Sequence, residues 1–219
     1  MEGYATWDHC TGVLPGGLDR PLGADDVTEE ASARAVSVVA GHVRFQGASR
    51  FVNKNTRNAR RIPYLASVFP DACFVHVVRH PVEVARSLAQ VAFWADLPIW
   101  WAGGRTPREL TDEGVDPLVL AARFWSRELA VVRRDRAGIP ADRFHDVRYE
   151  VLLDRPEGVV TALSAAIDVG PSAAVSAATA ARLTRGRGPT VRPELSTGAL
   201  DAIWTEVSDE ARAWGYEPG

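Results

Sequence analysis

The stretch CFVHVVRHPVEVARSL, residues 73–88, decides the fold of this chain. It begins with a nearly continuous apolar run rich in β-branched residues, CFVHVV (73–78), which is typical of a strand covered on both faces in a parallel sheet. Pro81 suits the first position of a helix, and the pattern predicts that this helix runs to about Phe93. A second strand is predicted over 143–149, and strands alternate with long helical patterns. We therefore expect an α/β fold in which helices flank a parallel sheet.

Working outward, helix and strand signals divide the rest of the chain. Asp116 caps a long predicted helix over 117–138, and Asp154 with Glu157 forms a capping box for another helix. Residues 1–24 carry Gly and Pro and are expected to be irregular. The remaining predicted elements are helices over 28–46, 57–68, 154–167, 172–183 and 197–214, a short strand over 50–53, and a long loop over 94–116.

The composition is that of an ordinary globular protein. The chain has 219 residues, of which 46% are hydrophobic and 24% are charged, and this length suits one domain with a full core. Its net charge of -3 argues against a general nucleic-acid binder. Two cysteines are too few for a disulfide framework or a zinc site. The N-terminus has no signal-peptide pattern and no apolar run approaches the ~20 residues of a membrane span, so a cytoplasmic protein is expected.

Lys54 is the one lysine of the chain, because 24 of the 25 residues counted as Lys plus Arg are arginines. It sits in FVNKNTRN (51–58), directly after the strand predicted over 50–53. Lysine is a compact, rotatable point charge, suited to following the charge that develops on one oxygen during group transfer. One sequence leaves chance placement open as the alternative. The setting points to a site for a nucleotide sulfate or a nucleotide phosphate.

Polar side chains gather at the ends of predicted strands, where Lys54, Arg79 and Tyr149 stand. Ligands of α/β proteins bind at the carboxyl ends of the strands. Arg79 follows the strand over 73–78 and Ser87 lies two turns into the next helix, so a guanidinium fork and a hydroxyl can face one anion. This pairing suits a phosphate monoester. A surface arginine and a solvated helix serine are the alternative.

Two blocks of the sequence resemble a known family. FVNKNTRNARRIPYLASVFPDACFVHVVRHPVEVARSL (51–88) resembles the nucleotide-sulfate half of sulfotransferases that use 3′-phosphoadenosine 5′-phosphosulfate. This resemblance implies that Arg79 and Ser87 bind the 3′-phosphate of the donor. VRYEVLLDRPEGVVTAL (147–163) resembles a second block of the family, which implies that Tyr149 packs near the adenine.

Two further segments fit the resemblance. RGRG (185–188) is similar in placement to a basic, Gly-containing loop that closes over the 3′-phosphate in the family, which implies donor binding by Arg185 and Arg187. A solvated basic loop is the alternative for this segment. The ending, from ELSTGALDAIW (194–204) to WGY (214–216), looks like the bacterial branch of the family.

The resemblance also implies a reaction and an architecture. A sulfuryl group passes in line from the donor to a hydroxyl or amine of a small-molecule or glycan acceptor. The protein mainly positions the two reactants and neutralises their negative charge. Lys54 would stabilise negative charge on the sulfuryl group and on the leaving phosphate. No metal is expected, because lysine and backbone donors carry that task and the sequence shows no metal-ligand cluster. The implied architecture is the sheet of P-loop nucleoside-triphosphate hydrolases.

The chain departs from the family pattern in two places. A first strand with a loop of the type PRSGTT, which wraps the 5′-phosphosulfate, is not found, and TGVLPGGLDR (11–20) has glycines but no strand before it. We therefore expect a single domain over 1–219 that lacks the first β-α unit. Thr56 stands where relatives have Pro or the catalytic His, so no general base is identified. His76 is expected to pack in the core, and His80 to add charge to the phosphate site or to cap the helix.

Other functions stay open at this point. The missing loop favours a non-catalytic or truncated sulfotransferase-like module that no longer binds a nucleotide and has no turnover, whereas Lys54, Arg79 and Ser87 together oppose it. A nucleotide or sugar kinase shares this sheet type but needs an acid at a strand end to bind magnesium, and no predicted strand ends in Asp. The tryptophan-rich loop over 94–116 either binds an apolar or sugar acceptor or is anchored in the core.

Overall fold

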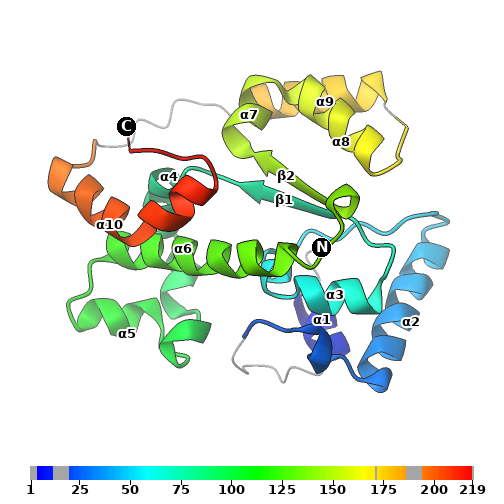
Figure 1. The fold of residues 1–219 in the computed structure, drawn as a ribbon, viewed down its shortest axis with the longest axis horizontal. Helices are drawn as coiled ribbons and strands as arrows, with labels where there is room; N and C mark the ends of the chain where they lie inside the picture. Colours follow the sequence, from blue (N-terminus) through cyan, green and yellow to red (C-terminus); the bar gives the residue numbers. More distant parts are fainter. Residues whose placement is uncertain (1–3, 12–19, 171, 186–193, 219) are drawn as a thin grey trace.

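The strands expected over 73–78 and 143–149 form a parallel pair in the computed structural model (Figure 1). β1 is Phe74–Val78 and β2 is Phe144–Arg148, and their register runs from Phe74 opposite Phe144 to Val78 opposite Arg148. The structure describes residues 4–11, 20–170, 172–185 and 194–218. The predicted class, an α/β fold with a parallel sheet flanked by helices, is confirmed.

Helices surround this strand pair (Figure 1). The α-helices are α1 (Tyr4–Thr11), α2 (Glu29–Phe45), α3 (Ile62–Val68), α4 (Pro81–Leu88), α5 (Pro107–Asp112), α6 (Pro117–Arg136), α7 (Tyr149–Asp154), α8 (Pro156–Ala166), α9 (Ala173–Arg185) and α10 (Thr197–Ala213). The 3-10 helices are η1 (Ala24–Asp26), η2 (Thr56–Arg60), η3 (Ala92–Asp96), η4 (Trp100–Ala102) and η5 (Ala141–Arg143). In the part of the chain that the structure describes, no helix is both long enough and apolar enough to cross a bilayer.

Helix α6 lies at the centre of the main core. Asp116 caps its first turn and Pro117 occupies its first position, as predicted. In Figure 1, α6 runs between α10 and α5, and it packs against α4 and α10. The core members on these helices include Leu120, Trp125 and Val132 of α6, Val82 and Ala85 of α4, and Ile203 and Val207 of α10. Full burial stabilises by roughly 1.5–3 kcal/mol per large apolar side chain, so this packing fixes α4 and α10 on α6.

A smaller core joins the N-terminal helices. Trp7 and Cys10 of α1 pack with Tyr64 and Leu65 of α3, and all four side chains are buried. The expectation that residues 1–24 are irregular is therefore wrong for α1. Trp7 and Cys10 stand three residues apart, which places both on one face of a helix, and that face joins a buried cluster with residues of α2 and α3.

The segment expected to be a strand over 50–53 forms no strand, and this prediction is wrong. A strand needs a neighbour to complete its ladder of hydrogen bonds, and no described strand lies beside this segment. Val52 is 87% exposed. The segment is held from its start instead, because the Arg50 guanidinium donates to the carbonyl oxygens of Ile167 at 2.6 Å and Asp168 at 2.9 Å.

The strand pair is covered unevenly on its two faces. One face carries His76 and Asp146, and the Trp214 ring packs 4.8 Å from the His76 ring. Side chains two residues apart share a face, so Val75 and Val77 lie together on the other face, where they are 44% and 52% exposed. The expectation that β1 is covered on both faces is therefore wrong for the described part of the molecule.

Two predicted helices and one predicted loop differ in the structure. The helix predicted over 57–68 is split into η2 and α3, and the helix that begins at Pro81 ends at Leu88 instead of Phe93. The predicted loop over 94–116 contains α5, whose first turn is closed by a capping box between Thr106 and Glu109.

The capping box predicted at Asp154 is also wrong. Asp154 ends α7, and α8 begins at Pro156 after Arg155. A residue that precedes proline avoids the helical conformation, and Arg155 has φ -130° and ψ 59°, so the chain breaks between two helices at this point.

We predict that Asp116→Ala lowers the free energy of unfolding by about 1 kcal/mol, the usual cost of an N-cap. Asp116 Oδ1 accepts from the N–H groups of Leu118 at 2.8 Å and Val119 at 3.1 Å, and both donors lose this partner in the variant. Urea unfolding followed by circular dichroism measures the change. Asp71→Ala, in an exposed turn, is the matched control. Equal stability of the two variants would contradict the capping role.

Candidate functional site

The carboxyl ends of β1 and β2 bring Arg79 and Tyr149 together. Each residue directly follows its strand, and parallel strands end at the same edge of a sheet. The guanidinium carbon of Arg79 lies 5.0 Å from the centre of the Tyr149 ring, within the range of a cation–π contact. An aromatic face and a guanidinium side by side can hold a base and a phosphate of one nucleotide.

Helix α4 adds a carboxylate and a hydroxyl beside this pair. Arg79 Nη2 donates to Glu83 Oε2 at 3.2 Å. Ser87 follows Glu83 by four residues, which places both on one face of α4. Arg79 precedes α4 and contacts it through Glu83, and the convergence of Arg79 and Ser87 on one anion stays a prediction.

The peptide unit that joins Arg79 to His80 is held on both of its sides. The Trp125 indole donates to the Arg79 carbonyl oxygen at 3.1 Å, and the His80 N–H donates to Glu150 Oε1 at 2.8 Å. Trp125 belongs to the buried side of α6, and Glu150 directly follows Tyr149. The backbone at Arg79 is thus fixed by one core residue and by one neighbour of its stacking partner.

The C-terminal segment completes this arrangement. The Tyr216 hydroxyl donates to Glu150 Oε2 at 2.9 Å, and its oxygen lies 3.3 Å from the Val78 carbonyl oxygen. The Arg148 guanidinium carbon lies 4.4 Å from the centre of the Tyr216 ring. Burial and then the hydrogen bond to the Glu150 carboxylate raise the pKa of Tyr216, so its hydroxyl stays a donor.

The Glu150 carboxylate is held in its charged form. Burial alone raises the pKa of Glu150, but hydrogen bonds from the N–H groups of His80 and of Glu150 itself, from the Tyr216 hydroxyl, and the charge of Arg148 outweigh it. The net pKa of Glu150 is lowered. A carboxylate with this many donors is a fixed acceptor, and it is poorly suited to take a proton from an acceptor substrate.

His80 occupies the N-cap position of α4, as one of its two expected roles requires, but its side chain makes no capping hydrogen bond. Its ring caps none of the N–H groups of α4, a helix that is described in full. The His80 ring lies 5.8 Å from the Trp204 ring and 5.3 Å from the Tyr216 ring, and burial lowers its pKa. A neutral ring in an aromatic surrounding adds no positive charge to a phosphate site at neutral pH.

Lys54 is exposed, and only Asn55 separates it from the start of η2. The side chains of both neighbours of Lys54 bind η2: the Asn58 amide donates to Asn53 Oδ1 at 2.7 Å, and Asn55 Oδ1 accepts from the Arg57 N–H at 2.9 Å. These contacts set where the Lys54 side chain leaves the backbone. Its convergence on the strand ends stays a prediction.

Two other sequence predictions fall partly outside the described residues. Arg185 is the last residue of α9, and Arg187 lies outside the described range. Residues 12–19, most of the glycine-bearing TGVLPGGLDR segment, also lie outside it. The donor-binding roles of Arg185 and Arg187 stay predictions.

His76 and the tryptophan-rich loop have structural partners. His76 Nδ1 lies 3.0 Å from Asp146 Oδ1, and the ring packs on Trp214, as expected for a packed histidine. In the loop, the Trp100 indole and an Arg60 Nη1 both donate to Glu128 Oε1, at 2.7 and 2.6 Å. Anchoring of the loop is therefore the interpretation that these contacts favour.

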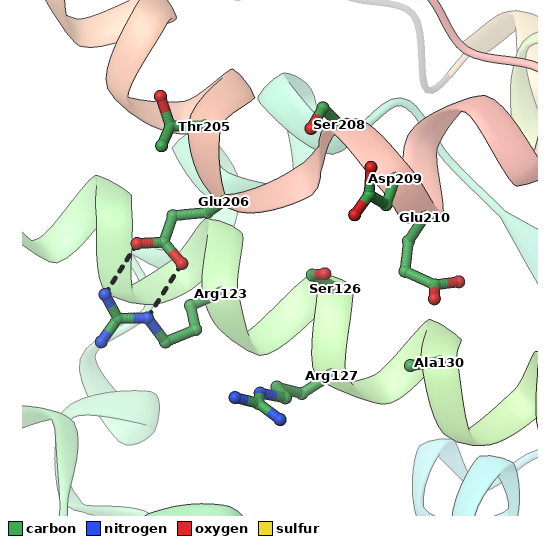
Figure 2. A pocket seen from close by; sticks show the side chains of 9 residues that line it. All are labelled: Arg123, Ser126, Arg127, Ala130, Thr205, Glu206, Ser208, Asp209 and Glu210. Carbon is green, nitrogen blue, oxygen red and sulfur yellow. Dashed lines mark hydrogen bonds and ion pairs between the residues drawn. The ribbon is translucent and has the colours of Figure 1, made fainter.

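A polar cavity of about 270 Å³ lies between α6 and α10, away from the strand ends (Figure 2). Figure 2 shows Arg123 and Glu206 in a two-point ion pair at its edge, with Nε–Oε2 and Nη2–Oε1 distances of 3.0 and 2.7 Å. Its described lining does not include Lys54, Arg79 or Tyr149, so it is separate from the candidate site. Within the ranges that the structure covers, no group of three His, Cys, Asp or Glu side chains is placed to hold a metal ion.

Sequence reasoning missed Glu150, Trp125 and Tyr216. Their partners lie 70, 46 and 66 residues away along the chain, so no local spacing marks them. Only their positions in the sequence could have pointed to two of these residues: Glu150 follows Tyr149, and Tyr216 lies in the WGY ending.

The comparison with protein families identifies the class of this chain. A model described as "Sulfotransferase family" matches residues 10–170, so the chain belongs to the sulfotransferase family. The fold is similar to a solved structure titled "Sulfotransferase Domain from the Curacin Biosynthetic Pathway", with a TM-score of 0.53 and 15% identity over 97% of this chain and 85% of that chain. This likeness shows a shared fold. No curated protein matches the chain.

We predict that stability falls on acidification from about pH 7.5 to about pH 5.5, partly through His80. Burial lowers the pKa of His80, and Arg148 and Arg79 add to this, although Glu150 and Glu83 oppose it. The unfolded chain therefore binds a proton below about pH 6.5 that the folded protein resists, which favours unfolding as the pH falls.

Urea unfolding at the two pH values tests this prediction. His80→Phe keeps an aromatic ring and should flatten the pH dependence, whereas His9→Gln at an exposed site should not. An unchanged pH dependence in His80→Phe would contradict the prediction.

Proposed function

We propose that this chain is a sulfotransferase that moves a sulfuryl group from 3′-phosphoadenosine 5′-phosphosulfate to a hydroxyl or amine of a small-molecule or glycan acceptor. One observation carries the proposal: in a member of the sulfotransferase family, the Arg79 guanidinium lies 5.0 Å from the Tyr149 ring at the shared carboxyl edge of two parallel strands. A nucleotide with an additional phosphate needs such a neighbouring pair of aromatic face and cation.

Each residue of the site has a proposed task toward the donor. Arg79 and Ser87 bind the 3′-phosphate, the first as a two-point donor and the second through its hydroxyl. Tyr149 packs on the adenine. Arg185 and Arg187 are proposed to close over the same phosphate.

Lys54 is proposed to act on the transferred group. In the transfer, the bond between sulfur and the bridging oxygen of the donor breaks, a bond between sulfur and the acceptor atom forms, and the acceptor proton passes to a base or to water. Negative charge grows on the leaving phosphate as the bond breaks. An ammonium that follows this charge lowers the barrier because it stabilises the transition state more than the bound donor.

A non-catalytic sulfotransferase-like module is the second candidate. It is favoured by the segment over 50–53, which leads to Lys54 without joining the described strand pair. Such a module would show no turnover, whether or not Arg79 and Tyr149 still bind a nucleotide. Binding and turnover must therefore be measured separately.

We predict that the full chain binds adenosine 3′,5′-bisphosphate and that Arg79→Ala weakens this binding by roughly 2 kcal/mol, about 30-fold. The physical reason is that the phosphate loses a guanidinium partner. Titration calorimetry measures both affinities. Arg108→Ala, which removes an exposed arginine paired with Asp96, is the control. Absence of binding by the unmodified chain would reject the proposed donor.

We predict that Lys54→Ala lowers sulfuryl transfer by about 100-fold or more while adenosine 3′,5′-bisphosphate still binds. Lys54→Arg should recover only part of the rate, because a planar, delocalised cation follows charge on one oxygen less well. Release of the bisphosphate from the donor, measured with panels of phenol, amine and glycan acceptors, is the readout. Binding without turnover in the unmodified chain would favour the non-catalytic module.

A further inference from the structure

The carboxylate of Glu150 joins three parts of the chain that the proposed chemistry does not connect. It accepts the His80 N–H at the end of β1, it belongs to α7 after β2, and it accepts the Tyr216 hydroxyl from the C-terminal segment. His80 directly follows Arg79, and Glu150 directly follows Tyr149. None of the described hydrogen bonds of Glu150 goes to the side chain of Arg79 or of Tyr149. Its partners indicate a task in placing the site.

The contact with His80 fixes the direction in which Arg79 leaves the strand. The N–H of His80 and the carbonyl of Arg79 belong to one planar peptide unit. Glu150 holds the N–H at 2.8 Å and Trp125 holds the carbonyl oxygen at 3.1 Å. Rotation of this unit would break both bonds at once. The Cα atom of Arg79 is bonded to the same unit, so the root of its side chain is fixed as well.

Glu150 also ties this root to the stacking partner of Arg79. Glu150 directly follows Tyr149, so the residue that holds the Arg79–His80 peptide shares a peptide bond with the residue whose ring Arg79 overlies. One short connection therefore sets the position of the Arg79 backbone relative to Tyr149. A carboxylate acceptor suits this task, because hydrogen bonds to charged groups are about twice as strong as neutral ones.

Tyr216 keeps the Glu150 carboxylate in place. Its ring is 2% exposed and lies against the His80 and Trp125 rings, at 5.3 and 6.5 Å between ring centres. Its hydroxyl donates to the carboxylate oxygen that His80 does not use. Both oxygens of Glu150 thus have a donor, one from β1 and one from the C-terminal segment.

We propose that Glu150, held by Tyr216, is a positioning residue that aims Arg79 at the 3′-phosphate of the donor and so sets the preference for a 3′-phosphorylated nucleotide. This inference rests on the proposed function of the site. It assigns selectivity for the extra phosphate to a residue that does not touch it. Loss of Glu150 should therefore lower the affinity for a nucleotide with a 3′-phosphate more than the affinity for one without it.

The test compares two ligands, adenosine 3′,5′-bisphosphate and adenosine 5′-monophosphate, on the full chain by titration calorimetry. In the unmodified chain we expect the bisphosphate to bind at least about tenfold more tightly. Glu150→Ala should reduce this ratio about tenfold, because the His80 N–H loses a charged partner. Affinity for the monophosphate should change less than about twofold. A loss of stability alone moves both affinities together, so the ratio reports positioning.

Glu150→Gln and Tyr216→Phe refine the test. The amide oxygen introduced by Glu150→Gln can accept from the His80 N–H, and the Tyr216 hydroxyl can then accept from the new amide and donate to the Val78 carbonyl, so this variant should restore most of the ratio. Tyr216→Phe keeps the ring and loses the donor, and it should lower the ratio even if Glu150→Ala fails to fold. Glu206→Ala, which breaks the pair with Arg123, is the control and should leave the ratio unchanged.

The outcomes separate the inference from the proposed function. If Arg79→Ala removes the preference for the bisphosphate but Glu150→Ala and Tyr216→Phe both keep it, the positioning role is overturned and the proposed function stands. If the unmodified chain shows no preference for the bisphosphate, the proposed donor is rejected and the positioning role is rejected with it. A selective loss in Tyr216→Phe or Glu150→Ala, with recovery in Glu150→Gln, supports the role.

Discussion

Burial of one side of α6 is the constraint on which the rest of the structure depends. α6 packs against α4 and α10, and Trp125 stands on that buried side. The Trp125 indole cannot be buried without a hydrogen-bond acceptor except at a cost, and the acceptor that it finds is the Arg79 carbonyl oxygen. The packing that buries Trp125 in the core therefore also fixes the backbone of Arg79. A change that moves α6 would move the end of β1 with it.

The same requirement accounts for the other contacts at the strand ends. A strand that ends inside a protein leaves peptide groups that its neighbour no longer pairs, and these groups need partners. The His80 N–H and the Val78 carbonyl are two such groups, and Glu150 and Tyr216 lie at hydrogen-bonding distance from them. The C-terminal segment is thus a structural part of the site. Residues that satisfy the backbone at a strand end also decide where the first side chain beyond the strand points.

Local signals in the sequence predicted the elements whose causes are local. The β-branched run in 73–78 predicted β1, and Asp116 with Pro117 predicted the start of α6, because these signals act within a few residues. The strand over 50–53 was predicted from the same kind of pattern and is absent, because a strand also depends on a neighbour that the pattern does not contain. The helix α5 was missed although its capping box, Thr106 and Glu109, was present in the sequence.

The residues of the candidate site also divide into those that the sequence predicted and those that it did not. Arg79 and Tyr149 could be placed from the sequence because each follows a strand and parallel strands end together. The contact between Glu150 and His80 spans 70 residues, and its geometry depends on the register of the two strands and on the turn into α7. No spacing rule contains that information. Family resemblance did not supply it either, because the motifs describe residues that touch the donor and leave out those that hold the backbone.

The ion pair between Arg79 and Glu83 bears on whether the site can accept a phosphate at all. The two side chains are 34% and 39% exposed, and an ion pair at this exposure contributes between about 0 and 1 kcal/mol. A phosphate offers the guanidinium two charge-assisted hydrogen bonds in place of the single one to Glu83. In the proposed site, Glu83 would hold Arg79 in place before a nucleotide binds, and the guanidinium would leave this exposed pair at little cost. The hydrogen bonds from Trp125 and to Glu150 would keep the Arg79–His80 peptide in place during that exchange. Only the end of the Arg79 side chain would then have to change partners.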